Sequence, residues 1–196
     1  MEKPSTKTKR TYLMTARAAA AEATRQRILE AALELFATRD YQDITLEDIA
    51  NQAQVAVPTL FRKFGNKEKL IEALAQYARA TVIEQRFAAT PGDIRGAVEN
   101  LLDHYELWGN RILRLLAQEH RVPAIRSVTD EGRLLHRKWV EVTFAPLLPS
   151  NKATRARRVA QLIAICDVYT WKILRHDLGL TRKEIARALL ELITAL

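Results

Sequence analysis

Apolar residues recur at helical spacing along most of the chain, and no segment alternates apolar and polar residues with the β-branched enrichment of a strand. The pattern predicts helices over about residues 25–38, 46–53, 57–64, 68–88, 94–108, 112–122, 127–144, 159–174 and 182–196. Glycine and proline mark breaks between the later helices, at Pro91-Gly92, Gly109-Asn110, Pro123, Pro146 and Pro149. We therefore expect an all-α protein.

Two short helices joined by a tight turn are predicted between Thr45 and Lys67. Thr45 is a good N-cap residue, and Asp48 three positions later can complete a capping box, so the first helix should begin at Leu46. The apolar period resumes at Val57 after an offset too short for an ordinary loop, which implies that the two helices cross at a steep angle. This is the pattern of a helix-turn-helix, whose second helix enters the DNA major groove.

The outward face of that second helix can approach phosphates. No acidic residue occurs between Asp48 and Glu68, and Pro58 lies near the first turn, where exposed backbone amides suit a phosphate oxygen. Basic residues end the helix and would contact the DNA backbone. The predicted DNA-binding residues are Arg25, Thr45, Val57, Pro58, Thr59, Phe61, Arg62, Lys63 and Lys67.

A longer run of residues makes this prediction more specific than the two-helix pattern alone. It comprises Arg27-Ile28-Leu29, Ala31-Ala32, Leu35-Phe36-Ala37, Tyr41, Thr45, Asp48-Ile49-Ala50, Ala53, Val55, Thr59-Leu60, Phe64 and Lys67-Glu68. On these residues, positions 24–70 resemble the N-terminal DNA-binding domain of the TetR family of bacterial transcriptional regulators. The resemblance implies a homodimer that binds a palindromic double-stranded DNA operator, usually as a repressor that a small-molecule effector releases. It implies no cofactor.

Four residues depart from the family pattern, mostly around the turns. Gln54 and Asp40 stand where glycine is usual, so Gln54 is expected to adopt a left-handed conformation in spite of its Cβ. Ala56 replaces the usual serine cap of the recognition helix, which removes one cap hydrogen bond. Phe61 replaces the usual tyrosine. These changes bear on operator affinity more than on the fold.

Charge distribution divides the chain into three parts. The net charge is +8, but residues 24–70 carry seven basic and seven acidic groups, so DNA binding does not follow from bulk charge. Residues 1–23 form a basic N-terminal arm with Lys3, Lys7, Lys9 and Arg10, whose first fourteen residues have a composition that does not fold alone. The arm either follows DNA or is simply a solvated leader. Its alanine-rich part, residues 15–23, can extend the first helix backwards.

Residues 71–196 form the expected helical domain for ligand binding and dimerisation. Residues 159–174 are apolar nearly all round, and Thr181 with Glu184 predicts a capping box for a final helix with a wide apolar stripe. One face of each helix can pack on its own domain, and the other needs a partner, which a four-helix bundle between two protomers supplies. The predicted interface residues are Ile163, Ile185, Leu189, Leu192 and Ile193.

Aromatic and polar residues of this domain are candidates for an effector pocket. The set is His104, Tyr105, Trp108, Trp139, Phe144, Asp167, Tyr169 and Trp171. Aromatic residues at helical spacing are equally compatible with a core, and Asp167 either anchors a cationic ligand or pairs with a structural donor. Cys166, the only cysteine, is interpreted as a small core residue or a redox sensor.

Other function classes find less support in the sequence. A single cysteine, no apolar run of about 20 residues and no signal-peptide pattern favour a cytoplasmic protein without a membrane association. No phosphate loop, zinc-protease motif, nucleophile elbow or Glu-x-x-His pair occurs, so we expect no enzyme and no metal site. The alternative is a DNA-binding protein of the same fold without a small-molecule effector, either architectural or controlled by a protein partner.

Overall fold

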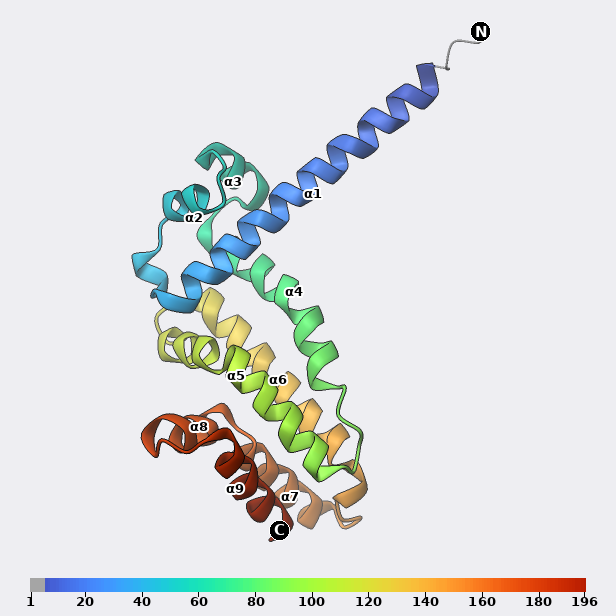
Figure 1. Cartoon of the computed structure of the whole chain (residues 1–196), viewed down its shortest axis with the longest axis vertical. Helices are drawn as coiled ribbons and strands as arrows, with labels where there is room; N and C mark the ends of the chain where they lie inside the picture. The colour runs from blue at the N-terminus through green and yellow to red at the C-terminus, as the bar shows by residue number, and fades with distance from the viewer. Residues whose placement is uncertain (1–5) are drawn as a thin grey trace. The chain divides into compact units, whose positions relative to one another are not determined.

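The computed structural model describes residues 6–196, with side chains from residue 15 onward, and every regular element in this range is helical (Figure 1). The prediction of an all-α protein is confirmed. The chain divides into two compact units, of which the first ends at Leu74 and the second runs from Ala75 to Leu196. The boundary lies within one continuous helix, α4 (Lys67–Arg86).

The first unit contains α1 (Thr6–Thr38), a short 3-10 turn (Tyr41–Asp43), α2 (Leu46–Gln52), α3 (Val57–Phe64) and the start of α4. Its core is formed by apolar residues that are fully buried, namely Ile28, Leu29, Ala32, Ile44, Ile49, Ala50, Leu60 and Leu70. These positions carry the apolar period of the sequence. Burial of this shared core holds the two short helices, which would be marginal alone.

Helix α1 begins far upstream of the expected start near Arg25. From Thr6 onward the first residues are helical, which was not predicted for them, because they continue a helix that the alanine-rich segment propagates. Residues 15–23 do extend the helix backwards, as the sequence allows, and their side chains are nearly all exposed. Lys3 of the proposed basic arm lies outside the described residues.

The second unit contains the rest of α4 and five further α-helices, of which α8 continues into a π-helical turn (Ile173–Asp177). The helices are α5 (Ile94–Gln118), α6 (Pro123–Thr143), α7 (Lys152–Ile165), α8 (Val168–Lys172) and α9 (Arg182–Thr194). Helix α5 packs against α6, α8 and α9, while α7 packs against α6 and α9 (Figure 1).

Other helix boundaries differ from the prediction as well. Helices α6 and α7 begin earlier than expected, at Pro123 and Lys152, and two further differences have a local reason. Helix α5 runs through Gly109, where a break was expected, and the missing side chain there leaves room for the Trp171 ring. A Cβ at Gly109 would overlap that ring. The predicted helix over residues 159–174 is instead two helices, since the Asp167 carboxylate accepts a hydrogen bond of 2.8 Å from the Tyr169 backbone and starts α8.

Helix α9 begins with the predicted capping box, in which Thr181 and Glu184 satisfy each other's backbone amides. The apolar stripe of α9, however, packs inside the protomer. Ile185, Leu189 and Ile193 are at most 5% exposed, so assigning them to a dimer interface is wrong. They pack instead with the aromatic side chains of α5, α6 and α8.

Candidate nucleic-acid interface

Thr45 and Asp48 start α2 as the capping-box pattern predicts. The Asp48 backbone amide donates to Thr45 Oγ1 at 3.0 Å, and the Thr45 amide donates to the Asp48 carboxylate at 2.9 Å. These hydrogen bonds from Thr45, reinforced by the Arg39 guanidinium, lower the pKa of Asp48. The start of the helix-turn-helix is therefore fixed by local contacts.

The turn between α2 and α3 contains the expected left-handed residue. Gln54 has φ of 55° and is the only non-glycine residue with positive φ in the described part of the chain. The conformation lets the Val55 amide donate to the Ala50 carbonyl at 2.9 Å, which closes the end of α2. A Cβ is strained in this conformation, typically by about 1–2 kcal/mol.

Replacing Gln54 with glycine is expected to stabilise the protein by roughly 0.5–1 kcal/mol, because the strain relieved exceeds the added entropy of the unfolded chain. Urea unfolding of the variant should show a higher midpoint. Gln52→Gly, within α2, is the matched control and should lower the midpoint by a similar amount. A Gln54→Gly midpoint below that of the wild type would contradict the strain argument.

Helix α3 presents an outward face without any carboxylate. Pro58, Phe61 and Arg62 are exposed, with the Phe61 side chain 61% accessible, while Leu60 and Phe64 face the core. Ala56 makes no side-chain cap, as expected from the missing serine. The remaining predicted contacts on this helix, Val57, Thr59 and Lys63, are half-buried. The arrangement offers base edges an apolar and a guanidinium contact. At the helix start Pro58 has no N–H and the Thr59 amide donates to the Ala56 carbonyl at 2.8 Å, so only the Val57 amide is left for a phosphate.

Helix α1 contacts α3 through two of the predicted basic residues. Lys63 Nζ donates to the Ala21 carbonyl at 2.7 Å. The Arg25 guanidinium lies 5.8 Å from the centroid of the Phe64 ring and 3.8 Å from the Glu22 carboxylate. Arg25 and Lys63 therefore brace α3 against α1 in addition to carrying charge at its edge.

Lys67 makes structural contacts that the sequence did not predict. Its ammonium donates to the backbone carbonyls of Tyr41 and Ile44, both at 2.7 Å, and lies 3.9 Å from the centroid of the Tyr41 ring. Burial lowers the pKa of Lys67. The Tyr41 hydroxyl in turn donates to Glu68 at 2.7 Å. Because the ammonium donates to these carbonyls, Lys67 has a structural role in the first unit, and its contact with a phosphate stays a prediction.

The residues predicted to line an effector pocket are mostly packed in the core of the second unit. His104, Tyr105, Trp139, Phe144 and Trp171 are at most 5% exposed. Asp167 caps α8, which agrees with the structural alternative, whereas Trp108 is half-buried and Tyr169 is exposed. Cys166 is buried, and burial raises the pKa of its thiol to about 12, so the core interpretation fits better than redox sensing.

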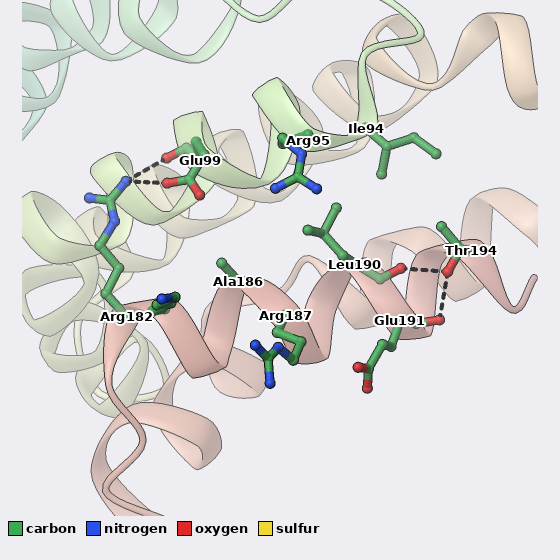
Figure 2. A pocket seen from close by; sticks show the side chains of 10 residues that line it. Ile94, Arg95, Glu99, Arg182, Ala186, Arg187, Leu190, Glu191 and Thr194 are labelled. Atoms are coloured by element: carbon green, nitrogen blue, oxygen red, sulfur yellow. Dashed lines mark hydrogen bonds and ion pairs between the residues drawn. The ribbon is translucent and has the colours of Figure 1, made fainter.

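A hollow of about 870 Å³ lies elsewhere, between α5 and α9, and none of the predicted residues line it (Figure 2). Its walls are strongly charged. Arg182 at one end pairs with Glu99 at 2.7 Å and with Asp103 at 2.6 Å, which raises the pKa of its guanidinium. Arg95 extends into the same space, and Arg187 is a further lining residue (Figure 2). Sequence reasoning missed this hollow because it arises only when two distant helices pack.

Two general properties of the described residues complete the picture. None of the helices has the length and apolarity needed to cross a membrane. From residue 15 onward, no group of three or more His, Cys, Asp or Glu side chains is placed to hold a metal ion.

Known proteins similar to this chain are transcriptional regulators with a helix-turn-helix. Residues 28–74 match the family model described as bacterial regulatory proteins, tetR family. Over 133 residues the chain is 43% identical to the uncharacterized HTH-type transcriptional regulator TtgW of Pseudomonas putida, covering 64% of this chain and 90% of that protein. It is 42% identical, also over 133 residues, to the HTH-type transcriptional regulator SrpR of Pseudomonas putida, covering 64% of this chain and 57% of SrpR.

Other matches cover a smaller part of the relative's sequence, and solved structures show a similar fold over most of the chain. The chain spans only 37–57% of the length of several other matched regulators. The crystal structure of a transcriptional regulator from Rhodococcus sp. Rha1 superposes with a TM-score of 0.69 at 13% identity, covering 87% of this chain and 94% of that one. The helix-turn-helix geometry, the family model and the alignment that covers 90% of TtgW agree. The chain belongs to the tetR family of bacterial regulatory proteins.

Proposed function

We propose that this protein is a homodimeric transcriptional repressor in the cytoplasm that reads a palindromic DNA operator with α3. The observation that carries the proposal is the carboxylate-free outward face of α3, held in place by the capping box of α2 and by the contacts of α1. Pro58, Phe61 and Arg62 are its central contacts. Thr45, Val57, Thr59, Arg25 and Lys63 flank them.

Dimerisation would use the exposed faces of α7 and α9. Helix α7 exposes a row of small residues, Ala153, Ala156, Ala160 and Ala164, and α9 exposes Leu192, which is 47% accessible. Small side chains allow two helices to approach closely, and Leu192 supplies the apolar contact that a bundle needs. Ile163, half-buried on α7, remains a proposed interface residue, whereas the buried residues of α9 are no longer proposed as part of the interface.

A small-molecule effector is the proposed signal for operator release. Helix α4 begins in the first unit and ends in the second. A ligand that moves the C-terminal end of α4 would therefore change the position of α3 through one continuous helix. Typical couplings of this kind amount to about 1–3 kcal/mol. A regulator without an effector is the second candidate, and the packing of Trp139, Phe144 and Trp171 into the core favours it.

Arg62→Ala is expected to weaken operator binding roughly tenfold or more and to reduce the salt slope by about 1 for each recognition helix. Its stability should not change, since the side chain is exposed. The operator is first selected from a random DNA library, and affinity is then measured over a series of salt concentrations. Arg121→Ala, an exposed arginine of the second unit, is the matched control.

Lys67→Ala gives the contrasting result in the same series. It should lower the free energy of unfolding by about 1–3 kcal/mol, because two backbone carbonyls lose their donor.

An unchanged salt slope in Arg62→Ala would show that Arg62 does not contact phosphate. Selection of no DNA sequence, with strong salt dependence, would favour an architectural protein.

A further inference from the structure

The N-terminal part of α1 is helical although its described side chains are exposed. Helix α1 is 33 residues long, and the part upstream of its contact with α3 projects beyond α3 (Figure 1). Every side chain from residue 15 to residue 23 is exposed. The many alanines of this stretch favour the helix, since burial does not hold it. The surface of this part of α1 is therefore available to a partner.

Basic residues of α1 fall in one row along the helix. At about 100° per residue, positions 7, 10, 17 and 25 all lie within about 40° of position 21 around the helix axis. These positions hold Lys7, Arg10, Arg17 and Arg25. No acidic residue occurs from position 6 to position 21. The helical register therefore gathers charge of one sign along one side of the helix.

The same side of α1 contacts α3. Lys63 Nζ, near the end of α3, donates to the Ala21 carbonyl at 2.7 Å. The Arg25 guanidinium lies 5.8 Å from the centroid of the Phe64 ring, also of α3. Arg17, one helical turn upstream of Ala21, is exposed. The basic row therefore continues from the proposed DNA-reading helix toward the N-terminus of α1.

The helical form of this segment limits what it can contact on DNA. A helix with its side chains is about 10–12 Å wide, whereas the minor groove is about 6 Å wide, so the segment cannot enter that groove. From position 21 to position 6 it is about 22 Å long, which is the length of about six base pairs. The DNA groups that such a row can reach are the backbone phosphates.

We propose that the N-terminal part of α1 is a phosphate-binding arm, which lies along the DNA backbone beside the half-site that α3 reads. The inference rests on the proposed DNA binding by α3 and adds a second DNA-contacting element. Contacts to phosphates position a protein on the duplex and carry no sequence information. The arm therefore adds affinity that depends on salt and not on the base sequence.

Arg17→Ala tests the arm on the selected operator. Loss of one phosphate contact from each protomer should reduce the salt slope by about 2 for a dimer and weaken binding roughly tenfold. The ratio of affinities for the operator and for a duplex with one changed half-site base pair should stay at the wild-type value. A fall in this ratio would reveal base reading and overturn the phosphate assignment. Circular dichroism should show no loss of helix, because alanine is the better helix former.

Arg10→Ala and Lys9→Ala form a matched pair at neighbouring positions. Each removes one positive charge, but position 9 lies about 120° from position 21 around the helix and is outside the row. Arg10→Ala should reduce the salt slope as Arg17→Ala does, whereas Lys9→Ala should keep the wild-type slope. Equal slopes in the matched pair, or an unchanged slope in Arg17→Ala, would overturn the proposal.

Ala16→Pro tests whether the helix holds the row in place. Proline can start a helix but cannot continue one, so positions 6–15 should unwind while α1 persists downstream and every charge is kept. The salt slope should fall at least as far as in Arg10→Ala. A wild-type slope in Ala16→Pro would show that the charges act from a flexible chain and would overturn the helical arm.

The two proposals fail in different measurements. Operator selection together with a wild-type slope in Arg17→Ala and Arg10→Ala would refute the arm alone. Selection of no operator would refute sequence reading by α3. The arm is then measured on a random-sequence duplex at low salt, where a smaller slope in Arg17→Ala than in Lys9→Ala supports it and equal slopes refute it.

Discussion

Leu189→Glu is expected to unfold the second unit. Leu189 is 1% exposed within the core that α9 shares with α5, α6 and α7. The change removes a buried leucine side chain, at about 2–5 kcal/mol, and adds a carboxylate without a partner, at several kcal/mol more. Together these approach the whole stability of a typical domain, about 5–15 kcal/mol. Circular dichroism and urea unfolding would show the loss of cooperative structure.

Leu192→Glu, three residues further along the same helix, is the matched control. Leu192 is 47% exposed, so the variant should keep its helical content and its unfolding midpoint as a protomer. If α9 forms the dimer contact, this variant sediments as a monomer. A Leu189→Glu protein that folds normally and only dissociates would contradict the observed burial. A Leu192→Glu protein that remains dimeric would remove Leu192 from the interface.

Mild acid is expected to destabilise the second unit through His104 and His136. Burial, followed by the charge of Arg86, lowers both native pKa values from the ordinary 6.5, to about 3 and about 4. Between pH 6.5 and these values the unfolded chain binds protons that the native histidines do not, so stability falls as pH falls. Well below pH 6.5 each histidine contributes up to about 1.4 kcal/mol per pH unit.

From pH 7 to pH 5 the two histidines together should remove about 4 kcal/mol from the free energy of unfolding. The lowered carboxyl pKa values, such as that of Glu119 near 2, affect stability only at more acid pH and leave this window clear. Urea unfolding at several pH values measures the slope. His104→Gln and His136→Gln should each remove about half of it, whatever their effect on stability at pH 7, and an unchanged slope in both would refute the assignment.

Local rules were enough to predict the helix-turn-helix. The capping box of Thr45 and Asp48 and the apolar period of α2 and α3 involve residues within a few positions of one another. The left-handed Gln54, in contrast, was expected from the family resemblance, which has glycine at this position. Such contacts depend little on the rest of the fold. The inward-pointing ammonium of Lys67 was missed, since it depends on carbonyls more than twenty positions away.

The second unit shows where sequence patterns are insufficient. A wide apolar stripe such as that of α9 predicts burial but does not tell an internal partner from a second protomer. Arg86 ends an amphipathic helix, where an arginine is usually solvated, and only packing against α5 and α6 buries it. The hollow between α5 and α9 likewise depends on helices that lie about 80 positions apart.

The close approach of Gly109 to Trp171 has a consequence for the evolution of this chain. Because a Cβ at position 109 would overlap the indole ring, neither position can change freely while the other stays as it is. A descendant that acquires alanine at 109 needs a smaller ring or an aliphatic side chain at 171, and the reverse order of mutation first leaves a void. The two positions are therefore expected to covary among close homologues, with glycine retained wherever tryptophan is retained.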